Sequence, residues 1–209
     1  MSYAVKEAFI TLQGEGAQAG RLAVFIRFSG CNLWSGREED RAGADCTFCD
    51  TDFVGMDDDG GRYADADALA DRAAALWGPS PGRRYVVLTG GEPLLQVDAA
   101  LIDALHARNF EIAIESNGTI AAPDGIDWIC VSPKAGTEVV QRQGNELKLV
   151  YPQARLHPDD VAGWAFDHFF LQAMDGPSLH DNQQAAMRFI YDHPRWRLSV
   201  QTHKLIGLR

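Results

Sequence analysis

Short apolar segments alternate with helical patterns along the chain, and this alternation limits the folds open to it. We expect strands at residues 24–28, 85–88, 111–115, 128–131, 146–150, 169–171 and 198–200. We expect helices at residues 66–77, 97–107, 158–164 and 179–191. Such alternation predicts a parallel sheet with right-handed crossovers. Because the units are too few for a complete eightfold barrel, we predict an α/β fold, a partial, shortened (β/α) barrel. An open doubly wound sheet is the alternative.

The net charge and the lack of long apolar runs exclude some classes of binding partner. The chain has 209 residues and a formal net charge of −10. Nucleic-acid binders usually present a basic face, so we expect no nucleic-acid partner. No signal-peptide pattern opens the chain, and no run approaches the roughly 18 apolar residues of a membrane helix. We therefore expect a cytoplasmic protein with no membrane partner, whose cysteines bind metal or do chemistry more often than they pair in disulfides.

Three of the four cysteines are grouped. Fourteen residues separate Cys31 from Cys46, and two separate Cys46 from Cys49. Cys130 lies inside an expected strand, where we expect it to be a small buried apolar residue. The group is compatible with three free thiols, with a structural zinc site that needs a fourth ligand, or with an iron–sulfur cluster. In the last case, one iron remains open to a chelating substrate.

Polar residues follow the ends of several expected strands. The segment Thr89-Gly90-Gly91-Glu92-Pro93 is typical of a strand, a tight turn and a helix start. Its glycine pair allows backbone to approach a ligand closely, and a carboxylate or carbonyl there can receive an ammonium group. In a parallel sheet these strand ends share one edge, where the chemistry is expected. Taken alone, each of these polar strand ends is also compatible with an ordinary turn.

The residues around the cysteines, Cys31-Asn32-Leu33-Trp34 and Cys46-Thr47-Phe48-Cys49, resemble the cluster loop of radical S-adenosylmethionine (SAM) enzymes. The usual loop has three residues between its first two cysteines, whereas this chain inserts a polar segment at residues 32–45. The resemblance implies one 4Fe-4S cluster held by Cys31, Cys46 and Cys49. It also implies that SAM is bound by Gly91, Glu92, Ser116, Asn117, Ser132, Pro133, Lys134, Gln172, Ala173, Met174 and Asp175. The acids of the insertion, Glu38, Glu39, Asp40 and Asp45, are expected to be solvated and to bind no metal.

A narrower resemblance spans nearly the whole chain. It rests on Thr11-Leu12-Gln13-Gly14-Glu15-Gly16, Arg27-Phe28-Ser29-Gly30-Cys31-Asn32-Leu33, Ser132-Pro133-Lys134, Gln172-Ala173-Met174-Asp175-Gly176 and Gln201-Thr202-His203-Lys204. These motifs are similar to those of the 7-carboxy-7-deazaguanine synthase family. That family implies one radical SAM domain over residues 1–209 and a homodimer. The implied reaction is radical contraction of 6-carboxy-5,6,7,8-tetrahydropterin with loss of ammonia, a step toward queuosine, served by an electron donor such as flavodoxin or ferredoxin.

The implied chemistry assigns roles to polar residues at both ends of the chain. Arg27 can hold the pterin carboxylate with two parallel bonds, and Glu15 can accept the N–H groups of the aminopyrimidinone edge. The expected substrate contacts are Leu12, Gln13, Gly14, Glu15, Arg27, Thr89 and His203. The resemblance further implies Mg²⁺ at Thr51, and no catalytic residue beyond the cluster and SAM.

Alternatives remain open at this point, both for single residues and for the whole chain. Arg27 also suits a surface ion pair, Glu15 a solvated loop, His203 a capping group and Thr51 a turn cap. For the whole chain, the alternatives are a glycyl-radical activating enzyme and a zinc-stabilised binding module.

Overall fold

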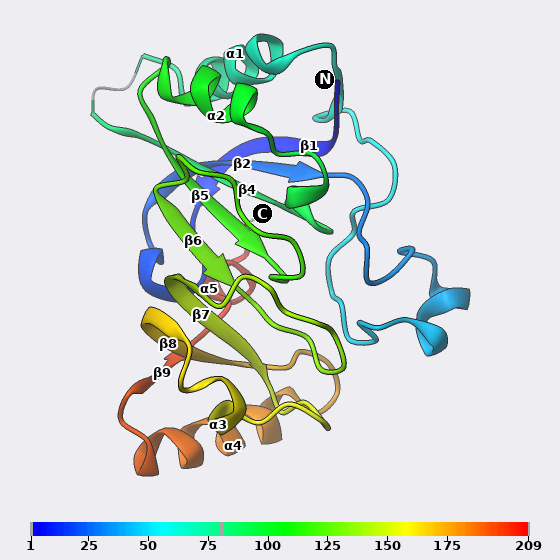
Figure 1. Ribbon diagram of the computed structural model, residues 1–209, viewed down its shortest axis with the longest axis vertical. Helices are drawn as coiled ribbons and strands as arrows, with labels where there is room; N and C mark the ends of the chain where they lie inside the picture. The colour runs from blue at the N-terminus through cyan, green and yellow to red at the C-terminus, as the bar shows by residue number, and fades with distance from the viewer. Residues whose placement is uncertain (1, 80–81, 209) are drawn as a thin grey trace.

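The computed structural model describes residues 2–79 and 82–208 and has one sheet of nine strands, which is not closed (Figure 1). The strand order is β3-β1-β2-β4-β5-β6-β7-β8-β9. β1 is antiparallel to β2 and β3, and every pairing from β2 to β9 is parallel. The strands are β1 (Tyr3–Leu12), β2 (Leu22–Phe28), β3 (Gly61–Tyr63), β4 (Arg84–Gly90), β5 (Phe110–Ser116), β6 (Trp128–Val131), β7 (Gln143–Tyr151), β8 (Ala165–Ala173) and β9 (Trp196–Ser199). The predicted partial barrel is confirmed.

The helices are α1 (Ala66–Trp77), α2 (Ala99–His106), α3 (Pro158–Val161), α4 (Leu179–Asp192) and α5 (Thr202–Ile206). Three short 3-10 helices join them: η1 (Gly16–Gln18), η2 (Glu38–Gly43) and η3 (Pro93–Leu95). Asp65 and Asp98 cap α1 and α2 by accepting from the backbone nitrogens of Ala68 and Leu101. Such caps satisfy N–H groups that the first turn of a helix leaves unpaired. In the part of the chain described, no helix is both long enough and apolar enough to cross a membrane.

Two apolar clusters hold the sheet to its helices. One joins β1, β2, β4 and β5 to α1 and α2, and the other joins β7, β8 and β9 to α4. On β7, Leu147 and Leu149 belong to the second cluster, and they alternate in sequence with Glu146 and Lys148. Side chains alternate faces along a strand, so the helices cover one face and charged residues occupy the other. That second face is the wall of the site.

The structure differs from the sequence prediction mainly at the ends of the chain. β1 was not predicted, because its register shifts between Val5 and Glu7 and breaks the alternation of buried residues. β3 is only three residues long, and α5 only five. The helix predicted at 158–164 ends at Val161, before a turn containing Gly163. The strand predicted at 198–200 starts earlier, because Trp196 pairs with Phe169 of β8.

The loop after β1 reaches across to the last strands of the sheet. The backbone nitrogen of Gly16 donates to Ser199 Oγ of β9 at 3.0 Å, and that of Ala17 donates to Glu146 Oε2 of β7 at 3.0 Å. Gly16 has φ +66°, and a Cβ there would lie 1.9 Å from Glu146 Oε1, so glycine is required. Thr202 of α5 then donates to the carbonyl of Gly14. The loop after β1 and the C-terminal segment therefore meet at one side of the barrel.

Candidate active site

The carboxyl ends of the parallel strands surround a cavity of about 500 Å³. All but two of the predicted site residues line it. They are Leu12, Gln13, Gly14, Glu15, Arg27, Cys31, Cys46, Cys49, Thr51, Thr89, Gly91, Ser116, Asn117, Ser132, Lys134, Gln172, Ala173, Met174, Asp175 and His203. The two that do not are Glu92 and Pro133. The structure thus brings together residues from almost the whole length of the chain.

The insertion between the first two cysteines is closed at its base. The carbonyl of Leu33 accepts from the backbone nitrogens of Asp45 (3.1 Å) and Cys46 (3.3 Å), so the intervening residues form a side loop. Cys31 also accepts from the backbone nitrogen of Leu33 at 3.4 Å. The long spacing in sequence therefore becomes a compact loop in space, and all three cysteines reach the same cavity.

Arg41 of the insertion braces the cysteine loop. Its Nη1 donates to the carbonyls of Thr47 and Cys49, both at 3.1 Å, and its guanidinium lies 4.0 Å from the centre of the Trp34 ring. Glu38 holds its Nε at 2.7 Å, while 77% of the Glu38 side chain is exposed. Like Glu38, Glu39 and Asp40 are exposed. The acids of the insertion thus lie in solvent. The insertion residue that holds the cysteine loop is Arg41, which was not predicted from the sequence.

All four cysteines are free thiols. Cys46 donates to Cys49 and lowers the pKa of Cys49 to about 6, although burial acts in the opposite direction. The same hydrogen bond, together with burial, raises the pKa of Cys46. Cys130 is 3% exposed and does not line the cavity, which confirms it as a buried residue.

The donor set fits a cluster better than a single ion. Three thiols face one cavity. Yet within residues 2–79 and 82–208, no three His, Cys, Asp or Glu side chains converge closely enough to hold one metal ion. Thiolates spread around a cavity suit a multi-iron group, whereas a structural zinc site needs four converging ligands.

The turn after β4 is packed against the turn before Cys31. The Glu92 backbone nitrogen donates to the Gly30 carbonyl at 3.0 Å, and a Cβ on Gly91 would lie 2.2 Å from that oxygen. The Glu92 side chain is fully buried and accepts from Leu94 N, Asn117 N and Ser116 Oγ. Burial raises the pKa of this carboxyl, against the effect of those hydrogen bonds. Glu92 therefore orders the wall from behind, and Gly91 presents backbone to the cavity.

A cation stands on each side of the cysteines. Lys134 donates from Nζ to the carbonyl and the hydroxyl of Ser132, both at 2.7 Å, and burial lowers its pKa. On the other side, Arg27 of β2 pairs through Nε with Glu7 at 2.7 Å. Its side chain is 21% exposed and lines the cavity. The ion pair with Glu7 fixes the orientation of the Arg27 guanidinium.

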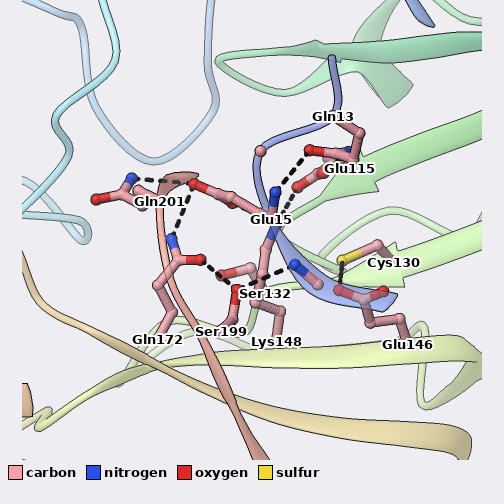
Figure 2. A network of polar contacts seen from close by, with 12 residues as sticks. Gln13, Glu15, Glu115, Cys130, Ser132, Glu146, Lys148, Gln172, Ser199 and Gln201 are labelled. Carbon is pink, nitrogen blue, oxygen red and sulfur yellow. Dashed lines mark hydrogen bonds and ion pairs between the residues drawn. The ribbon is translucent and has the colours of Figure 1, made fainter. Parts of the chain in front are cut away.

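The end of the cavity near α5 holds a network of charged and amide groups, shown in Figure 2. Lys148 Nζ lies 2.6 Å from Glu15 Oε2 and 2.5 Å from Glu115 Oε2. Glu15 Oε1 accepts from Gln172 at 3.1 Å and Gln201 at 3.0 Å. Burial alone would raise the pKa of Glu15, but the Lys148 ammonium outweighs it and lowers the pKa to about 2. Glu15 is therefore an ionised, fixed acceptor.

Several cavity residues are not among the predicted site residues, among them Lys148, Glu115, Asp50, Gln201 and Lys204. Lys204 bridges Asp50 (2.7 Å) and Asp175 (2.5 Å), which joins α5 to the loop after Cys49 and to the end of β8. For Lys148, a signal existed. A charged residue within an otherwise apolar parallel strand is rarely buried unless it is paired.

Comparison with known proteins agrees with this geometry. A family model described as the Radical SAM superfamily matches residues 42–146. The chain is thus a radical SAM enzyme by class, which implies a 4Fe-4S cluster and SAM.

Full-length relatives define the family within that class. The 7-carboxy-7-deazaguanine synthase of Bradyrhizobium diazoefficiens is 68% identical over all of both chains, and that of Bordetella pertussis is 64% identical over all of both. The crystal structure of QueE from Escherichia coli superposes with a TM-score of 0.73 at 27% identity, covering 96% of this chain and 94% of that one. The chain belongs to the 7-carboxy-7-deazaguanine synthase family.

Proposed function

We propose that this protein converts 6-carboxy-5,6,7,8-tetrahydropterin to 7-carboxy-7-deazaguanine with release of ammonia, and so supplies queuosine and other deazapurines. The observation that carries the proposal is the composition of the cavity. One wall has three free cysteines, and the same cavity presents Arg27 and the Glu15–Lys148 pair. Such a cavity suits an anionic heterocycle held beside a cluster and a second cofactor.

Cys31, Cys46 and Cys49 would hold the cluster, and the strand ends beside it would hold SAM. Gly91 offers a backbone carbonyl to the amino group of SAM. Ser116, Asn117, Ser132 and Lys134 offer hydroxyl, amide and ammonium groups for its carboxylate and ribose. When bound, the reduced cluster and SAM supply the radical that removes a hydrogen atom from C6 of the pterin.

The protein's own part is to orient the substrate and exclude water. Arg27 suits the pterin carboxylate, because a guanidinium forms charge-assisted, parallel bonds. Glu15 suits the N–H groups of the aminopyrimidinone edge, because it is ionised and can only accept. Aromatic side chains on the walls limit solvent at the reacting centre; they are Phe9, Phe25, Trp34, Phe48 and Phe53.

A magnesium ion is the second part of the proposal. Thr51 lines the cavity two residues after Cys49. Mg²⁺ often needs only one or two protein oxygens when a substrate anion supplies others. Such an ion would fix the pterin carboxylate and carbonyl in one orientation. Neighbouring Asp50 and Asp52 are engaged by Lys204 and Lys6, which leaves the Thr51 hydroxyl as the protein oxygen proposed here.

The remaining parts of the proposal follow from the family resemblance. We propose one radical SAM domain over residues 1–209 with an insertion at 32–45, a homodimer, a cytoplasmic location, and a flavodoxin or ferredoxin as electron donor. The closed base of the insertion supports its description as an insertion into one domain. The segment between Leu33 and Asp45 begins and ends at the same point, so it interrupts no strand of the sheet.

The test is turnover by anaerobically reconstituted protein with SAM, dithionite and the pterin, with mass spectrometric detection of 7-carboxy-7-deazaguanine. Absorption near roughly 400 nm should accompany reconstitution, as expected of thiolate-bound iron–sulfur centres. Cys46→Ala is the matched control and should show neither the absorption near roughly 400 nm nor the product. A reconstituted protein that cleaves SAM but leaves the pterin unchanged would instead point to another radical SAM reaction.

A further inference from the structure

Lys148 is a buried cation in the centre of the cavity wall. It lies on β7 and is 3% exposed. Its Nζ joins Glu15, from the loop after β1, to Glu115, at the end of β5. Figure 2 shows the three side chains converging from these separate elements. The cation therefore links the loop after β1 to strands β5 and β7.

The two carboxylates retain acceptor capacity after this pairing. Glu115 Oε1 accepts from Gln13 Nε2 at 3.0 Å, and its Oε2 accepts from Lys148. An ionised carboxylate has about four acceptor sites, and the hydrogen bonds of Glu15 and Glu115 with Lys148 and the nearby glutamines occupy only some of them. Both residues line the cavity, so the free sites can face a ligand.

Without a cation, two neighbouring carboxylates in a poorly solvated site tend to share a proton. A protonated carboxyl donates one hydrogen bond and would oppose an N–H donor of the ligand. Lys148 suppresses this state, since its attraction outweighs burial and keeps the pKa of Glu15 low. The reciprocal attraction of Glu115 and Glu15 raises the pKa of Lys148 despite its burial.

We propose that Lys148 is a positioning residue for substrate recognition, which keeps Glu15 ionised and holds the carboxylates of Glu15 and Glu115 in place so that both accept N–H groups of an aminopyrimidinone ring. This inference rests on the proposed pterin substrate. It assigns Lys148 no contact with the reacting atoms. Recognition of the ring then depends on a charge arrangement that spans the loop after β1, β5 and β7.

Other titratable groups lie around Lys148 and Glu15, and they also contribute to the pH dependence of any binding experiment. Around Lys148 and Glu15 they are Cys130, Glu146, Lys134, His203, Asp50 and Tyr85. Burial raises the pKa of both Glu146 and Cys130. All of these groups remain in every variant below, but Lys148 also acts on the pKa values of Glu146, Cys130 and Lys134. The variant that adds Glu115→Gln separates their titration from that of the proposed carboxylate pair, because it alone removes an acid of that pair.

The experiment measures pterin and SAM affinity by calorimetry on the anaerobic, cluster-loaded protein between pH 6 and pH 8. Lys148→Met should weaken pterin binding at least about tenfold at pH 6, with the loss of affinity shrinking toward pH 8 as Glu15 ionises. SAM affinity should change by less than about twofold, since no SAM contact is removed. Adding Glu115→Gln to Lys148→Met should move the midpoint of this pH dependence to lower pH, because the like-charge neighbour is gone.

Arg108→Met is the matched control. Arg108 also lies between two carboxylates, those of Asp67 and Asp71, but away from the cavity. It should leave pterin affinity and its pH dependence unchanged. If Lys148→Met alone does not fold, the double variant with Glu115→Gln carries the test, because it buries one charge fewer.

Two outcomes would overturn the inference. One is a Lys148→Met protein with wild-type pterin affinity, and the other is an equal, pH-independent loss for pterin and SAM, which would mark Lys148 as purely structural. Failure of the proposed function is a different result, because wild type itself would then not bind or convert the pterin.

Discussion

The backbone nitrogen of Cys46 donates to the carbonyl oxygen of Leu33 at 3.3 Å, which closes the insertion onto its own base. Loop closure costs little more for a long loop than for a short one, so the chain tolerates the extra residues. The cysteine loop is then held by Arg41, the one insertion residue that reaches the carbonyls of Thr47 and Cys49. This arrangement makes the acids and the cation of the insertion separable by experiment.

Arg41→Met should speed loss of iron from the reconstituted protein by at least about threefold, because two carbonyls near the cluster lose a charge-assisted partner. The triple variant Glu38→Gln, Glu39→Gln, Asp40→Asn should keep its full metal content, since these side chains are exposed. Iron release to a chelator, followed at 400 nm, measures both. Stoichiometric metal loss in the triple variant would contradict the assignment of these acids to solvent.

Three of the four cysteines should be needed for iron binding, and the fourth should not. Replacing Cys31, Cys46 or Cys49 with Ala should remove most of the bound iron, because each supplies one thiolate to the cavity. Cys130→Ala should retain it, at a modest cost in stability of about 1 kcal/mol for the small void. Iron and sulfide analysis after reconstitution decides between these outcomes. Iron retention by Cys46→Ala would refute the ligand set.

Arg27→Ala should weaken pterin binding at least about tenfold, since a charge-assisted bond contributes roughly 1.5–3 kcal/mol. SAM binding should stay within about twofold of wild type. Glu7→Gln is the companion variant. Glu7 orients the Arg27 guanidinium, so this substitution disturbs the orientation but keeps the guanidinium, and it should lower pterin affinity less than Arg27→Ala does. Equal losses for pterin and SAM in calorimetry would mean that Arg27 is only structural.

Thorough chelation should slow turnover by wild type, and added Mg²⁺ should restore it. Thr51→Ala should respond much less to Mg²⁺, because the proposed protein oxygen is gone. Thr51→Ser keeps the hydroxyl and should respond as wild type does. Full turnover by chelated wild type would reduce Thr51 to a turn residue.

Acid should remove the stability that Glu15 provides. The pKa of Glu15 is lowered from 4.5 to about 2, so its contribution is fully present above pH 4.5 and disappears as pH falls toward 2. The difference in unfolding free energy between wild type and Glu15→Gln should therefore be constant above about pH 5.5 and shrink below pH 4.5. Urea unfolding of cluster-free protein at several pH values measures this difference. A difference that grows toward low pH would contradict the ionised assignment.

Local sequence patterns predicted the elements whose pattern is regular. Strand 128–131 and helix 66–77 appear with the predicted bounds, because a buried strand and an amphipathic helix each have a distinct periodicity. β1 escaped prediction, since a register shift and the buried charge of Lys6 disturb its alternation. Lys6 is tolerated there because Asp52 and Asp57 pair with it at 3.0 and 2.9 Å.

The site was predictable where its residues follow strand ends, and less so where partners are distant in sequence. The cysteines and the turn after β4 were predicted, because strand ends meet at one edge of the sheet. Glu92 was placed in the SAM site, yet its hydrogen bonds to Ser116 and Asn117 put it behind the wall. The roles of Lys148 and Arg41 depend on contacts made only in the folded chain.

The loop at residues 13–17 and the segment at 201–204 have a consequence for the order in which the protein acquires its function. Glu15 and Gln201 hydrogen-bond although they lie 186 positions apart, and Thr202 seals Gly14. Contacts of such long separation form late. During translation the cysteine loop and strands β1 to β8 are synthesised first, while the recognition pocket waits for residues 201–204. The cysteine loop is thus complete in the growing chain before the chain can form the pocket proposed for the pterin.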